Sequence, residues 1–154
     1  RWVDYAIKHI IVPLDGSPRA EQAIETALPL AQRLGARLTV MYSIPWLQAT
    51  YAAPPELLAV GTISAETDAQ VEADMHAYLR ELVERYQGRY ALEQIAMRGA
   101  EADAINQAAE NHQVDLIVMT THGAGGIVHR GLGNVCNAVT RSSGVPVMIV
   151  RPAE

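Results

Sequence analysis

The sequence predicts an α/β fold, with a doubly wound, open, five-stranded parallel sheet and helices on both faces. Short apolar runs rich in β-branched residues alternate with segments whose apolar residues recur at helical spacing. The connections are short apart from one loop, which favours crossovers between parallel strands. Hydrophobic residues make up 49% of the 154 residues but aromatic ones only 5%, with no Phe, which suits the aliphatic core of a parallel sheet. We expect a single domain over 1–154.

The chain begins with a predicted strand and helix. The apolar run 8–14 (KHIIVPL) predicts a buried strand that ends in a turn at Asp15. Ser17 suits a helix cap, Pro18 suits the first helical turn, and Gly35 ends the helical pattern. The apolar residues at helical spacing are predicted to face the core: Ala20, Ala23, Ile24, Ala27, Ala31 and Leu34.

The middle of the chain continues the alternation. A second strand is predicted over 37–44, followed by a long loop over about 45–62. An amphipathic helix is predicted from about 64 to 87, a third strand over 90–97 and a third helix over 101–112.

The last part supplies two more strands and one helix. A fourth strand is predicted over 116–120, and a loop with five glycines (THGAGGIVHRGLGN) follows it. The next helix is predicted from about 134 to Gly144, and a fifth strand over 145–150. The helix residues predicted to face inward are Val135, Ala138, Val139 and Ser142.

Composition narrows the possible partners. The net charge is −5 and there is no basic stripe, so we expect no nucleic-acid partner. The sequence contains no segment with the length and apolarity of a membrane-spanning helix, and we expect no membrane association. A single cysteine, Cys136, offers neither an internal disulfide nor a Cys-based zinc site, which is typical of a reducing cytoplasm.

Chemistry-bearing residues collect where the predicted strands end. Asp15 follows the first strand, Ser43 lies near the end of the second, and the fourth strand runs through Thr120 into His122 and Gly123. Ligands of open α/β sheets bind outside the carboxyl ends of the strands. Glycines let backbone amides approach a ligand, and the start of the following helix has unpaired amides. This edge is therefore predicted to bind phosphate.

Three segments resemble the universal stress protein family, namely IIVPLDGSPRAEQAI, DLIVMTTHGAGG and SSGVPVMIVR, so the resemblance spans nearly the whole chain. Nucleotide-binding members carry a glycine, two residues, a glycine, nine residues, a glycine and then Ser or Thr. This chain keeps Gly123, Gly133 and the spacing, but has Thr120 for the first glycine and Asn134 for the final Ser or Thr. The Asn134 amide can donate to a phosphate oxygen or turn inward as a helix cap.

The resemblance implies a sheet of order 3-2-1-4-5, a cytoplasmic homodimer and, in some members, an adenine nucleotide in the crevice. We therefore expect a stress-response sensor or switch that binds ATP, or AMP or ADP, and that contacts a protein partner of unknown identity. The alternative is a nucleotide-free homodimeric interaction module. No P-loop, nucleophile elbow or positioned base is present, so neither catalytic residues nor an enzyme are expected. The expected nucleotide-binding residues are Pro13, Leu14, Asp15, Ser43, Met119, Thr120, His122, Gly123, Gly133, Asn134 and Val135.

Several of these residues have a structural alternative. Asp15 can bind a ribose hydroxyl, an adenine edge or nucleotide-bound Mg²⁺, or it can simply stabilise the Asp-Gly turn. His122 can carry a proton or be structural, and Cys136 can be a reactive thiol or a buried apolar residue. His9 and His112 lack partners at metal-ligand spacing, so no metal site is expected from the protein alone.

The predicted fifth strand is also the predicted dimer interface. In the order 3-2-1-4-5 it lies at a sheet edge, whose unpaired backbone groups proteins normally cover. Antiparallel pairing of 145–151 with a second copy would satisfy these groups, although Pro146 lacks a donor.

Overall fold

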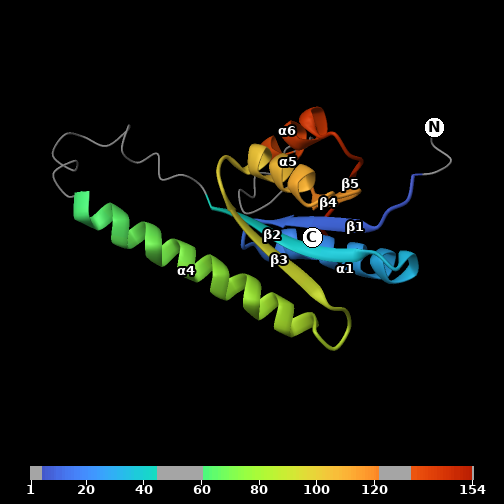
Figure 1. Ribbon diagram of the computed structural model, residues 1–154, viewed down its shortest axis with the longest axis horizontal. Helices are drawn as coiled ribbons and strands as arrows, with labels where there is room; N and C mark the ends of the chain where they lie inside the picture. Colours follow the sequence, from blue (N-terminus) through green and yellow to red (C-terminus); the bar gives the residue numbers. More distant parts are fainter. Residues whose placement is uncertain (1–4, 45–60, 122–132, 154) are drawn as a thin grey trace.

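The computed structural model describes residues 5–44, 61–121 and 133–153 (Figure 1). Its strands pair in parallel in the order β3-β2-β1-β4-β5, which confirms the predicted fold class and strand order. The strands are β1 (His9–Leu14), β2 (Arg37–Ile44), β3 (Leu92–Arg98), β4 (Leu116–Thr120) and β5 (Val147–Val150). The described helices are α1 (Pro18–Leu34), α4 (Gly61–Tyr86), α5 (Glu101–Asn111) and α6 (Asn134–Ser142).

The helices form two layers that enclose the sheet. In Figure 1, α4 lies below the sheet and α5 and α6 lie above it, and α1 shares its core with α4. Each layer has its own apolar core, because side chains of a strand alternate between the two faces. Ile10 and Val12 of β1 pack toward α1 and α4, whereas Ile11 packs toward α5 and α6. Among the described residues, no helix combines the length and apolarity needed to cross a membrane.

Helix α1 starts and ends as its sequence predicts. The Ser17 hydroxyl accepts a hydrogen bond from the amide of Ala20 at 3.2 Å, and Gly35 ends the helix with a φ of 63°. The prediction that Leu34 faces the core was wrong, because its side chain is 47% exposed. Leu28 is buried instead, since it lies four residues after Ile24 on the same helical stripe.

Besides their apolar contacts, α1 is joined to α4 and to the turn after α4 by hydrogen bonds and ion pairs. The Tyr86 hydroxyl donates to the Glu25 carboxylate at 2.7 Å, and the Arg89 guanidinium donates to the same carboxylate at 3.0 Å. These bonds lower the pKa of Glu25, while burial and the adjacent carboxylate raise the pKa of Tyr86 to about 12. A similar arrangement joins Tyr78 and Arg85 to Glu21.

Hydrogen bonds at the amino edge of the sheet connect residues far apart in the chain. The Asp115 carboxylate accepts from the amides of Lys8 and His9, at 2.8 and 3.0 Å. The His9 ring is buried, with one nitrogen 2.9 Å from the His112 carbonyl oxygen and the other 2.6 Å from the Thr39 hydroxyl. These contacts attach the start of β1 to the turn before β4.

The predicted element boundaries are displaced mainly at strand starts. β3 begins at Leu92 instead of 90, β5 at Val147 instead of 145, and α4 at Gly61 instead of about 64. In α6 the predicted inward positions Ala138 and Ser142 are exposed. Val139 is buried and Val135 packs partly buried against the core, as predicted, whereas Cys136 is a buried position that the prediction missed.

Candidate functional site

The carboxyl ends of β1 and β4 meet where the strand order reverses. In open α/β sheets, a crevice forms outside the strands at this point. Because α5 and α6 each precede a parallel strand, both helices begin at this edge and run back across the same face (Figure 1). His122 and Gly123 lie outside the described residues. The other predicted site residues belong to elements that end or begin here: Pro13, Leu14, Asp15, Ser43, Met119, Thr120, Gly133, Asn134 and Val135.

Strand alternation divides these residues between the two faces of the sheet. Met119 packs in the apolar cluster beneath α5 and α6. Tyr42 packs on the opposite face, with α1 and α4, so the next residue, Ser43, lies on the same face as Met119. Leu14 is buried against α1 and α4, and Thr120 alternates onto the Leu14 face. A ligand at the carboxyl edge, on the face of the sheet that α5 and α6 cover, would therefore approach Ser43 and Met119 by their side chains, and Leu14 and Thr120 by their backbone.

Asp15 organises the turn between β1 and α1. Its carboxylate accepts from the Ser17 amide at 2.9 Å and from the Ser17 hydroxyl at 2.5 Å. Gly16 supplies a φ of 83°, and its Cα faces the Tyr42 ring, which a β-carbon would approach at 3.6 Å. The structural role considered for Asp15 is therefore present. A ligand contact of this carboxylate stays a prediction.

Tyr42, near the end of β2, lies beside the site, although only its neighbour Ser43 was predicted as a binding residue. Its hydroxyl donates to the Asp15 carbonyl oxygen at 3.1 Å, and its ring meets Tyr78 edge to face with centroids 5.9 Å apart. Burial raises the pKa of the Tyr42 hydroxyl, and the negative charges of Asp15 and Glu101 raise it further. The Tyr42 hydroxyl therefore stays neutral and, as a hydrogen-bond donor, holds the turn between β1 and α1 in place.

Glu101, the first residue of α5, was also missed. It lies two residues beyond Gly99, after β3, at the edge where β1 and β2 also end. The carboxyl is partly buried, and burial raises its pKa, with a further rise from the negative charge of Asp15. Ligands of open α/β sheets bind outside the carboxyl ends of the strands, and this rule selected residues after β1 and β4. Applied to the end of β3, the same rule would have selected Glu101.

The start of α6 leaves backbone donors without helical partners. The cap residue, Gly133, has a φ of −59°, and its amide donates to the Thr121 carbonyl at 2.7 Å. Among the described residues, no side chain caps the start of α6, and Asn134 is exposed as the first helical residue instead of turning inward as a cap. The next amides, of Asn134 and Val135, belong to the first helical turn and have no intrahelical acceptor. Such a helix start favours an anion.

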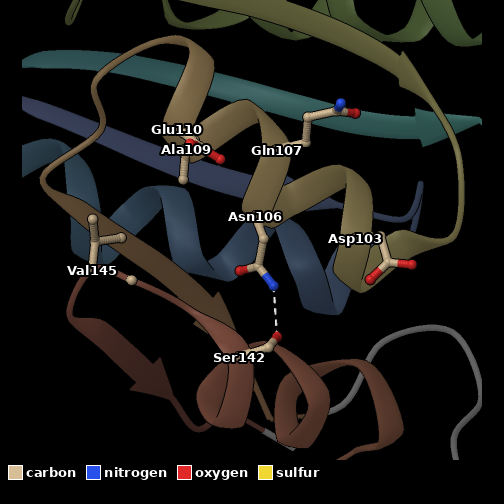
Figure 2. A pocket seen from close by; sticks show the side chains of 8 residues that line it. Asp103, Asn106, Gln107, Ala109, Glu110, Ser142 and Val145 are labelled. Carbon is tan, nitrogen blue, oxygen red and sulfur yellow. Dashed lines mark hydrogen bonds between the residues drawn. The ribbon is translucent and has the colours of Figure 1, made fainter.

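A separate open groove of about 720 Å³ runs between α5 and α6 (Figure 2). Asn106 donates to the Ser142 hydroxyl across it at 2.6 Å. Its charged lining residues, Asp103 and Glu110, are both acidic, which disfavours a phosphate ligand. Within the described ranges, no group of three or more His, Cys, Asp or Glu side chains is placed to hold a metal ion.

Comparison with known proteins identifies similar sequences along almost all of the chain. The model of the universal stress protein family matches residues 6–151. A universal stress protein of Thermus aquaticus, named for its place in the QAH/OAS sulfhydrylase 3′ region, is 31% identical over 144 residues, covering 94% of this chain and 98% of that protein. A universal stress protein of Mycolicibacterium smegmatis is 31% identical over 146 residues. The chain spans 45% of that relative's length, and the match covers 93% of the chain.

Solved structures of similar fold include proteins with and without a named ligand. The universal stress protein UspA from Lactobacillus plantarum has a TM-score of 0.80 at 23% identity, covering 95% of this chain and 99% of that one. A universal stress protein in complex with cAMP has a TM-score of 0.67 at 26% identity, covering 96% and 99%. An Arabidopsis thaliana family protein with AMP bound has a TM-score of 0.65 at 16% identity, covering 95% and 92%.

Proposed function

Because this chain belongs to the universal stress protein family, we propose that it is a stress-response protein that binds an adenine nucleotide, ATP foremost, outside the carboxyl ends of β1 and β4. One observation carries the proposal: the uncapped start of α6 lies at the same sheet edge as the Asp15 turn. The first offers amides to phosphates, and the second offers acceptors to a nucleoside. The cAMP complex of a neighbour at 26% identity supports this choice of ligand class.

The proposed pose uses the two ends of the crevice differently. The amides of Asn134 and Val135 hold phosphate oxygens, and Gly133 leaves room for them. Asp15 meets the ribose or the base edge, while Ser43 and Met119 line the base from the α5–α6 face. The nucleotide's own phosphates would carry most of the coordination of any Mg²⁺, with Asp15 as at most one protein ligand. The backbone at Pro13, Leu14, Thr120, His122 and Gly123 completes the proposed site.

Binding rather than turnover is the proposed activity, with nucleotide occupancy acting as a sensor or switch in the cytoplasm. Mass spectrometry of ligand released from protein purified without added nucleotide tests it. We expect co-purified ATP, ADP or AMP, or micromolar binding of ATP by calorimetry. An empty protein that also ignores added nucleotide would favour the interaction module instead. Phosphate release at about one per second or faster would contradict the assignment as a non-enzyme.

The edge strand β5 favours self-association as a second part of the function. The Pro146 carbonyl accepts from the amide of Ile117 in β4, and the Val150 carbonyl accepts from Thr121, just after β4. The alternate residues Val147 and Ile149 therefore direct their backbone groups outward. Met148 is 37% exposed on this strand. We propose that a second copy pairs with 145–151 and forms a two-fold dimer.

Replacing Ile149 with proline is expected to convert the dimer to a monomer, because proline removes an outward amide donor and spares the bonds to β4. Light scattering should give twice the 16.7 kDa chain mass for the wild type and the single-chain mass for the variant. Ile149→Ala is the control, since it loses similar packing but keeps the amide. A monomeric wild type, or a proline variant that stays dimeric, would contradict this interface.

A further inference from the structure

Two acidic residues that interact electrostatically lie at the carboxyl edge of the sheet, where the helix proposed to bind phosphate also starts. Asp15 follows β1, and Glu101 begins α5. The register pairs the last residues of β2 and β3, so the chain leaving β3 reaches α5 beside the end of β2. Figure 1 shows α5 and α6 on one face of the sheet, and these helices begin at Glu101 and Asn134.

Glu101 differs from four other glutamates of the described residues because no arginine side chain pairs with its carboxylate. Each of those four carboxylates has an arginine partner: Glu21 with Arg85, Glu25 with Arg89, Glu72 with Arg98, and Glu93 with Arg37. In the part of the chain that the structure describes, the Glu101 carboxyl makes no hydrogen bond or ion pair. Its negative form is therefore uncompensated although the side chain is partly buried.

The charged and titratable groups described around Glu101 supply no positive charge that would stabilise its carboxylate. From β1 it faces the Asp15 carboxylate, and from β2 the Tyr42 hydroxyl, which already donates to a carbonyl. From β3, Arg98 is engaged by Glu72 of α4. On its own helix the nearest charged residue is Asp103, another acid. Burial raises the pKa of Glu101, and the negative charge of Asp15 raises it further.

An anionic ligand at the start of α6 adds further negative charge to this edge. The ligand and the ionised Glu101 then repel each other, whereas the ligand and the neutral carboxylic acid do not. By linkage, protonation of Glu101 strengthens binding of the anionic ligand, and binding of the ligand strengthens protonation of Glu101 by the same factor.

We propose that Glu101 makes nucleotide affinity at this crevice depend on pH, so that binding takes up a proton at Glu101 and is tighter in mildly acidic solution than at neutral pH. This inference rests on the proposed nucleotide-binding function. Protonated Glu101 removes one negative charge from the edge, and glutamine at this position does the same at every pH.

Calorimetric titration with cAMP and with ATP, between about pH 5 and about pH 8, tests the inference. The phosphodiester of cAMP does not titrate in this range, so its profile reports the protein alone. Wild-type affinity for cAMP is expected to fall about tenfold from the acidic to the basic limit. Glu101→Gln should bind with the acidic-limit affinity throughout. Titration in buffers of different ionisation enthalpy should show proton uptake that the variant loses.

Asp103→Asn is the matched control, since it removes an exposed acidic group from the same helix and should keep the wild-type pH profile. Parallel profiles for wild type and Glu101→Gln would overturn the role of Glu101 while leaving nucleotide binding intact. Failure of both proteins to bind either ligand at any pH would overturn the proposed function together with this inference.

Discussion

Replacing Gly133 with valine is expected to abolish measurable nucleotide binding while leaving the protein folded. The φ of −59° and ψ of 159° at Gly133 suit any residue, including a β-branched one, so the backbone need not change. The added methyl groups would stand beside the first amides of α6 and keep phosphate oxygens away from them. Losing two charge-assisted hydrogen bonds of about 1.5 kcal/mol each corresponds to about a hundredfold weaker binding or more.

Calorimetry with ATP measures the loss, and circular dichroism checks that α6 and the fold persist. Gly144→Ala is the matched control, because Gly144 lies in the turn after α6, has no positive φ, and a β-carbon there would meet no atom within 4 Å. The control should bind like the wild type. Unchanged ATP affinity in Gly133→Val would show that the phosphates bind elsewhere.

Truncating Leu82 to alanine is expected to cost about 2–5 kcal/mol of unfolding free energy, because the side chain is fully buried and its removal leaves a cavity. Leu82 belongs to the core between α4, α1 and the sheet, together with Leu79 and Tyr86. Urea denaturation at one fixed protein concentration measures the change, since self-association also contributes to apparent stability.

Leu34→Ala provides the comparison within the same helical layer. Its side chain is 47% exposed, so we expect a change within about 0.5 kcal/mol. Equal and small effects of the two substitutions would mean that α4 does not pack on the sheet as described.

The fold could be predicted because each clear hydrophobic pattern in the sequence fits only one kind of element and one kind of connection. Strands such as 9–14 and 116–120 are buried from both faces, and between them the helical stripes allow only parallel crossovers. Where the pattern is weak, the prediction failed in part. The nine residues of α6 contain small side chains that suit several faces, and the actual stripe through Cys136 is decided by packing against α5 and the sheet.

The candidate site was predictable only where a strand end or a glycine marks it. Asp15 and Gly133 carry such signals. Tyr42 and Glu101 also lie near strand ends, but their roles come from tertiary proximity: the Tyr42 hydroxyl reaches the Asp15 carbonyl oxygen, and Glu101, at the start of α5, interacts electrostatically with Asp15. Single-sequence periodicity places residues on elements but does not tell which side chains of separate elements meet.

The attachment of β1 to Asp115 affects the order in which the chain can fold during synthesis. β1 pairs with β2 and β2 with β3, and all three strands precede residue 99. These strands, with α1 and α4, can assemble while the rest of the chain is still being made. Asp115, which holds the amides of Lys8 and His9, and β4 emerge later. The ligand crevice outside the carboxyl ends of β1 and β4 is therefore completed last, so the nascent domain acquires its proposed nucleotide site only near the end of translation.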